Sequence, residues 1–162
     1  EAEAMLSGIV LDTKNLTMRT GERTFDAAAF LRRAGADTIE VKKLMQSGIE
    51  QTVAKYKILQ NARTYRSVAI AMPETAQDRI VAAQAADELL NVAGVEASMV
   101  MYPDGDGVSV SARAIGDVNV QMIMEKLGGG GNRNAAAAQI KGVSLRDGVS
   151  MLIKAIDEYM DS

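Results

Sequence analysis

The residues best suited to binding chemistry lie between Ser109 and Asn132. An alternation typical of a strand places Ser109, Ser111 and Arg113 on one face and small apolar residues on the other. The segment then reaches a run of four consecutive glycines: Gly128, Gly129, Gly130 and Gly131. Without a Cβ, a backbone N–H can approach an anion closely, and the chain can adopt positive φ without steric cost. Alone, the glycines would suit a flexible loop, and Arg113 would suit a solvated charge at the edge of a sheet. Together, the two features predict an anionic ligand.

A second candidate for chemistry is Asp12. An apolar run from Gly8 to Leu11 leads directly into this carboxylate. A carboxylate that leaves a buried strand is a common metal ligand. A carboxylate in such a place can equally cap a helix or a turn, and the neighbouring residues leave both interpretations open.

The composition limits the chemistry that the chain can perform. It has 162 residues, of which 48% are hydrophobic, enough for one full domain and part of another. It has no histidine and no cysteine, so it supplies no imidazole base, no thiol nucleophile and no nitrogen or sulfur ligand for zinc. Eighteen basic and 21 acidic residues give a net charge of −3, which argues against a protein that wraps long nucleic acid. No apolar run approaches the roughly 18 residues of a membrane span.

The part of the chain before Tyr65 is predicted to be helical. Residues 1–6 have helical composition but no capping residue ahead of them, as expected of a piece cut from a longer helix. Thr24 can cap a short helix over residues 25–34. Apolar residues at about 3.6-residue spacing then predict a connector helix over residues 41–64.

From Tyr65 to the end the pattern is that of one α/β domain. The expected strands cover residues 67–72, 96–102 and 108–113, the last two joined by a hairpin turn at 103–107. The expected helices are one opened by Thr75 and Asp78, one over 118–127 capped by Asp117, and a last one opened by the capping box Ser144 to Asp147. Residues 134–140 suit either a helical turn or a strand. We therefore expect a small mixed sheet with flanking helices over residues 65–162, preceded by a helical segment over residues 1–40.

Several short motifs resemble a known family. Gly-Ile-Val-Leu-Asp-Thr-Lys-Asn around Asp12, Arg-Thr-Gly from Arg19 and Thr-Phe-Asp-Ala-Ala from Thr24 resemble the last segment of a DHH-family phosphoesterase domain. Ser-Ala-Arg ending at Arg113, Asn-Val-Gln from Asn119 and the four glycines resemble the DHH-associated C-terminal domain. The combination is most similar to the GdpP type of cyclic-di-AMP phosphodiesterase, a family of membrane-bound bacterial signalling hydrolases.

The resemblance implies a function for a longer protein, called the parent below. In that family two manganese ions activate the water that hydrolyses cyclic-di-AMP to a linear dinucleotide. Asp12 would be one metal ligand, and the others would lie upstream, so we expect this chain to be inactive alone. The parent would lie at the cytoplasmic face of the cell membrane, while this piece would be soluble. Its implied partners are the cyclic dinucleotide and the upstream catalytic domain, and apolar surface left by truncation would allow a homodimer.

The resemblance also assigns the substrate-binding residues. Arg113 would pair with a phosphate through its guanidinium fork, and Ser111 would donate a hydrogen bond. The glycine run would surround another phosphate or a base edge, and Asn119 would assist. At Asn132 the sequence departs from the family, which has histidine there. Asparagine cannot become cationic near neutral pH, although Arg133 could restore the positive charge.

Other functions suit the same motifs. A soluble oligoribonuclease would use the same two domains without a membrane anchor. A non-catalytic nucleotide sensor would explain the loss of histidine at position 132. A tRNA-contacting appendage of the kind found in alanyl-tRNA synthetases is opposed by the net charge of −3 and by the few aromatic residues. In an assembly domain, the glycine run would only pack.

Overall fold

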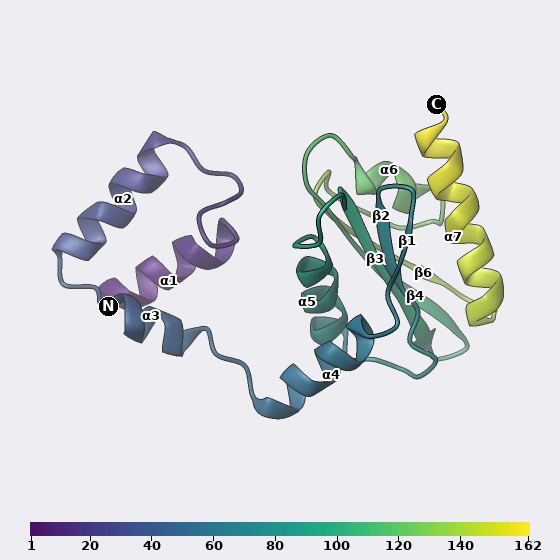
Figure 1. Cartoon of the computed structure of the whole chain (residues 1–162), viewed down its shortest axis with the longest axis horizontal. Helices are drawn as coiled ribbons and strands as arrows, with labels where there is room; N and C mark the ends of the chain where they lie inside the picture. The colour runs from purple at the N-terminus through teal and green to yellow at the C-terminus, as the bar shows by residue number, and fades with distance from the viewer. The chain divides into compact units, whose positions relative to one another are not determined.

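The computed structural model describes every residue from 1 to 162. The chain forms two compact units, residues 1–48 and residues 49–162, each of which is described by itself (Figure 1). The expected α/β class is confirmed, because helices come first and a six-stranded mixed sheet with flanking helices follows.

The first unit consists of three helices, α1 (Ala2–Asp12), α2 (Glu22–Arg33) and α3 (Thr38–Leu44). Its buried residues are Leu6, Leu31, Ala36 and Val41. The apolar run before Asp12 continues helix α1, so the strand alternative for this run is wrong; strong helix formers precede it and carry the helix onward. Thr24 is the third residue of α2 rather than its cap, and its Oγ1 accepts a hydrogen bond from the Gly21 N–H at 3.2 Å.

The connector helix expected over residues 41–64 is interrupted. Helix α3 ends at Leu44, and α4 begins at Ile49 and ends at Leu59. The break includes Gly48, and a glycine inside a helix costs about 1 kcal/mol relative to alanine. After α4 the chain enters a short strand at Arg63, which the sequence pattern did not predict.

The second unit is built on one sheet. Its strands are β1 (Arg63–Tyr65), β2 (Val68–Ala71), β3 (Ala97–Asp104), β4 (Gly107–Ala114), β5 (Gly130–Gly131) and β6 (Ala135–Ile140). They lie in the order β1-β2-β3-β4-β6-β5, and only the pair β2 and β3 runs parallel. The segment that suited either a helical turn or a strand is therefore strand β6, and half of the glycine run is strand β5 at the edge.

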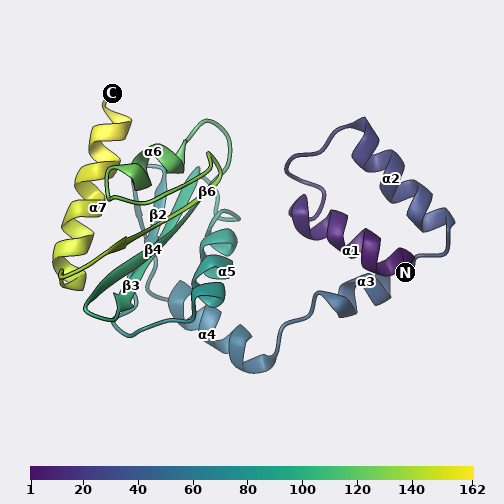
Figure 2. The ribbon, with the colours of Figure 1, turned by 180° about the vertical axis from the view of Figure 1, so that it is seen from behind.

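Helices cover both faces of this sheet, as Figures 1 and 2 show from opposite sides. Helices α6 (Val120–Glu125) and α7 (Leu145–Met160) pack on one face over a core that includes Met99, Met101 and Leu152. Helices α4 and α5 (Arg79–Leu89) pack on the other face, over a smaller core that includes Ala69 and Val100. Because α5 contacts β3 and β4, the part of this second face that belongs to β6 keeps exposed residues.

Capping side chains fix where helices α5, α6 and α7 begin. Asp78 caps α5, and its Oδ1 accepts hydrogen bonds from two backbone N–H groups of the first turn, at 2.8 and 3.1 Å. Asn119, rather than the expected Asp117, caps α6. Ser144 caps α7, as the capping box predicts.

Candidate functional site

The strand that carries Ser111 and Arg113 has the alternation expected from the sequence. Val108 and Val110 of β4 belong to the core under α6 and α7. Ser109, Ser111 and Arg113 therefore lie on the opposite face, the face that α5 partly covers. In the ladder Ser111 pairs with Ala137 of β6, and Ala137 pairs with Gly130 of β5. The fold thus brings Ser111 and the glycine run into one row across the sheet.

A pocket of about 370 Å³ opens on this face and is called the β4–β6 pocket below. It is lined by Gln77, Arg79, Tyr102, Asp104, Ser109, Val110, Ser111, Gly129, Ala137, Ala138 and Gln139. Of the residues predicted from the sequence, it brings together Ser111 and Gly129. Arg113, Asn119 and Asn132 are not in its lining. Its volume is within the range of small-molecule sites, near the lower end.

Arg113 lies next to this pocket on the same face of β4 but is held by α5. Its Nε lies 3.4 Å from Oδ1 of Asp87, and its Nη1 donates to the carbonyl oxygen of Ala112 at 2.8 Å. The side chain is only 19% exposed. Two of its three nitrogens are thus oriented by the protein, and Nη2 has no partner within the chain.

The glycine run makes the turn from α6 into the edge strand. The N–H groups of Gly128 and Gly129 donate to carbonyl oxygens of α6 at 3.1 and 2.9 Å, and the N–H of Asn132 donates to Ala135 at 2.8 Å. A Cβ on Gly129 would lie 2.1 Å from the carbonyl oxygen of Ala137. In this structure the run therefore allows a close approach of backbone to backbone, and these three N–H groups bond within the chain.

The two predicted asparagines both shape the backbone. The Oδ1 of Asn119 accepts from the N–H of Gln121 at 3.1 Å, which caps α6. The Oδ1 of Asn132 accepts from the N–H groups of Asn134 and Ala135, each at 3.0 Å, which holds the turn between β5 and β6. The acceptor oxygen of each side chain is thus used locally, whereas the Nδ2 donor of Asn132 has no partner in the chain.

Sequence reasoning missed Arg79, Tyr102 and Asp104, which line the pocket beside Ser111. The Oδ2 of Asp104 accepts from Oγ of Ser109 at 2.6 Å and from Nε2 of Gln139 at 3.2 Å. Burial, and then the charge of Asp104, raise the pKa of the Tyr102 hydroxyl. The signal that could have revealed Tyr102 is the hairpin register, which places it opposite Ser109.

Asp12 lies in the first unit as the last residue of α1, and it is exposed. The structure contains no group of three or more aspartate or glutamate side chains that could hold a metal ion. A two-metal centre needs several hard oxygen ligands, so the residues present here do not fit one. Asp12 can supply at most one ligand to such a centre.

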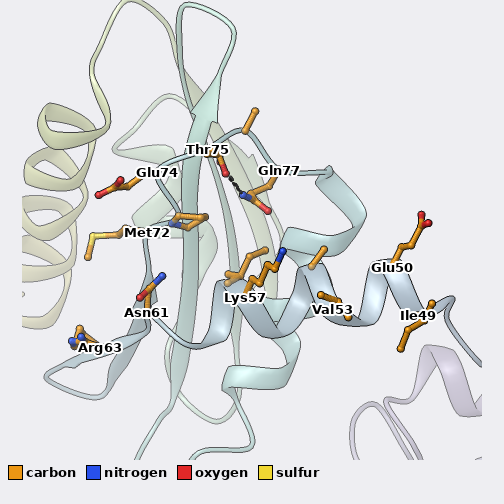
Figure 3. A pocket seen from close by; sticks show the side chains of 14 residues that line it. Ile49, Glu50, Val53, Lys57, Asn61, Arg63, Met72, Glu74, Thr75 and Gln77 are labelled. Atoms are coloured by element: carbon orange, nitrogen blue, oxygen red, sulfur yellow. Dashed lines mark hydrogen bonds between the residues drawn. The ribbon is translucent and has the colours of Figure 1, made fainter.

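A larger cavity, of about 1040 Å³, lies between α4 and the segment from Met72 to Gln77 (Figure 3). None of the residues predicted from the sequence lines it. Its charged side chains are all exposed and of mixed sign, with Glu50 in the first turn of α4 and Lys57 in the last. Size alone therefore does not make it the better candidate, and the β4–β6 pocket, with buried polar side chains, is preferred.

The family model described as "DHHA1 domain" matches residues 66–162, which is more than half of the chain. The chain belongs to the DHHA1 family. It is 47% identical to the cyclic-di-AMP phosphodiesterase GdpP of Geobacillus thermodenitrificans and 46% identical to the cyclic-di-AMP phosphodiesterase PdeA of Listeria monocytogenes. These alignments cover 99% and 98% of this chain but 25% of each relative. The chain thus spans about a quarter of the length of these two relatives.

The DHHA1 fold is also found in solved structures. An exopolyphosphatase-related protein from Bacteroides fragilis superposes with a TM-score of 0.86 at 18% identity, over 98% of this chain and 50% of that one. At this identity the likeness shows the fold alone. No helix of the chain is both long enough and apolar enough to cross a membrane.

Proposed function

We propose that this chain is the substrate-binding part of a metal-dependent phosphodiesterase whose parent hydrolyses cyclic-di-AMP to a linear dinucleotide. The observation that carries the proposal is the identity of 46 to 47% over nearly the whole chain with two relatives named as cyclic-di-AMP phosphodiesterases. The matched region includes every residue of the β4–β6 pocket. The binding chemistry of the parent's substrate would therefore be found on this sheet face.

The chain's own residues can hold and orient a nucleotide. Ser111 is 6% exposed, lines the pocket and makes no hydrogen bond through its hydroxyl within the chain. Arg113, one alternation further along the same face, is oriented by Asp87 and retains Nη2 for a phosphate oxygen. A guanidinium that is already oriented loses less side-chain entropy when it binds an anion than a mobile one does.

We propose Asp12 as one ligand of the parent's manganese centre. The isolated chain offers no group of three or more carboxylates that could hold a metal ion, and the chain spans only about a quarter of the length of these relatives. We therefore expect the 162-residue chain to bind the substrate without hydrolysing it. The catalytic domain of the parent would complete the site, and the parent would be anchored with this site on the cytoplasmic face of the membrane.

Titration calorimetry of the chain with cyclic-di-AMP at low salt tests this function. We expect saturable binding by the wild type and at least tenfold weaker binding by Arg113→Ala, because a hydrogen bond to a charged group is worth about 1.5–3 kcal/mol. The melting temperature of each variant shows whether it remains folded. Absence of binding by the wild type would overturn the proposal, and equal binding by Arg113→Ala would remove Arg113 from the site.

The departure at Asn132 gives a second arm of the same experiment. Asn132→His would introduce a group with a reference pKa near 6.5 beside an anionic ligand. We expect this variant to bind cyclic-di-AMP more tightly at pH 6 than at pH 8, while the wild type shows no such difference. Identical pH dependence of the two proteins would show that position 132 lies outside the binding site.

A further inference from the structure

Two buried hydroxyl groups of the β4–β6 pocket have no partner within the chain. Tyr102 is 4% exposed and Ser111 is 6% exposed, and neither hydroxyl makes a hydrogen bond to the protein. No fully buried side-chain oxygen or nitrogen of this chain lacks a partner, so both hydroxyls keep a small accessible surface. Because both residues line the pocket, that surface faces it. A ligand that fills the pocket takes water away from these hydroxyls, and each hydroxyl then left without a partner costs about 1–3 kcal/mol, so a ligand that supplies partners here is favoured.

The pocket wall also carries two opposite charges. Arg79, the first residue of α5, lines the pocket and has no ion pair or hydrogen bond within the chain. Asp104 lies in the same lining, and its two protein partners, Ser109 and Gln139, both bind Oδ2. Oδ1 of Asp104 is therefore an acceptor without a protein partner.

This arrangement favours a neutral ring over a second phosphate. A phosphate in the pocket would be attracted by Arg79 but repelled by the carboxylate of Asp104. A flat heterocycle with an amino donor next to a ring-nitrogen acceptor would suit all of the polar groups. The donor would bind Oδ1 of Asp104, and the acceptor would bind a hydroxyl. Gly129 and Ala137 leave room for a flat ring on their side of the pocket, because neither residue has a side chain beyond Cβ.

We propose that the β4–β6 pocket is a nucleobase subsite, in which Asp104, Tyr102 and Ser111 bind the amino-bearing edge of an adenine base. Arg79 would lie at the rim of the pocket and donate to the ring or sugar of the same nucleotide. The proposal rests on the function proposed above, which supplies the adenine, and it separates base recognition from phosphate binding at Arg113. Tyr102, Asp104 and Arg79 would then determine specificity.

Calorimetry with two pairs of variants, each a pocket residue and its control outside the pocket, tests the subsite. Tyr102→Phe removes one hydroxyl that has no protein partner, so we expect an unchanged melting temperature and about three- to tenfold weaker binding of cyclic-di-AMP. Tyr56→Phe, at a 53% exposed position outside the pocket, is the matched control and should bind as the wild type does. Asp104→Ala should weaken binding as well, whereas Asp106→Ala, in the exposed hairpin turn, should not.

The amino group of the base is tested with a second ligand, the cyclic dinucleotide of purine riboside, which lacks only that group. The wild type should bind it about tenfold more weakly than cyclic-di-AMP, and Asp104→Ala should bind the two ligands equally. Suppose that the wild type binds cyclic-di-AMP with an affinity that neither Tyr102→Phe, nor Asp104→Ala, nor the loss of the amino group changes. That result overturns the subsite, and the proposed function stands. If the wild type binds neither ligand, both proposals fall.

Discussion

The glycine run provides the sharpest separation of packing from binding, because two adjacent glycines have opposite surroundings. A Cβ on Gly129 would lie 2.1 Å from the carbonyl oxygen of Ala137 and 2.5 Å from Cβ of Ala138. A Cβ on Gly130 would meet nothing within 4 Å. Neither glycine has positive φ, so an alanine at either position is free of backbone strain. The variants Gly129→Ala and Gly130→Ala thus differ only in steric surroundings.

The magnitude follows from these distances. Contacts near 2 Å with backbone atoms force β6 or the turn to move, and overpacking of this kind costs about 3 kcal/mol. Replacement of glycine by alanine also lowers the entropy of the unfolded chain, which returns about 0.4–1 kcal/mol. For Gly129→Ala we expect a net loss of about 2–3 kcal/mol, or roughly 10 °C in melting temperature. Gly130→Ala should be unchanged or about 0.5 kcal/mol more stable.

Thermal unfolding followed by circular dichroism, with cyclic-di-AMP titrations of both variants, completes the test. Gly130 pairs with Ala137, which lines the pocket, so its added methyl group lies on the ligand's side of the sheet. We expect Gly130→Ala to bind more weakly despite normal stability. Equal melting temperatures for the two variants would refute the packing explanation. Normal binding by Gly130→Ala would mean that the ligand does not approach the run.

Two further predictions concern helix α7. Ser144→Ala removes the oxygen that accepts from the Asp147 N–H at 3.1 Å, so it should lower the free energy of unfolding by about 1 kcal/mol. The control Ser150→Ala, inside the helix, should change the free energy of unfolding by no more than about 0.5 kcal/mol. Equal melting temperatures of the two variants would contradict the cap. The hydrogen bond from Arg66 lowers the pKa of Asp161, so its stabilisation is present above the unfolded pKa and is lost as the pH falls through the folded one. Asp161→Asn should therefore flatten the melting-temperature profile below about pH 4, and an unchanged profile would contradict this ion pair.

Local patterns predicted the framework of the site well. Alternation alone placed Ser111 and Arg113 on the face opposite the valines of β4, and the structure agrees. The capping box at Ser144 likewise fixed the start of α7, because its hydrogen bond is between near neighbours in the sequence. Interactions of this range are encoded in a few residues, so a single sequence is enough to find them.

Features that depend on distant residues were not predicted. Asp87 of α5 holds Arg113, and no spacing in the sequence announces a pair 26 positions apart. The glycine run suggested an anion cradle, but the close approach of β6 that gives Gly129 its packing role arises only when the sheet forms. The strand alternative at Asp12 failed for a different, local reason, since a short apolar run suits a helix as well as a strand.

The central claim, that the chain binds cyclic-di-AMP on the open sheet face, is tested most directly by nuclear magnetic resonance. Amide spectra of the isotopically labelled chain would be recorded while the ligand is added. We predict that the largest shift changes fall on residues 109–113, on the glycine run and on Tyr102. Changes centred instead on Lys57 and Met72 in the larger cavity of Figure 3, or no changes at all, would contradict the claim.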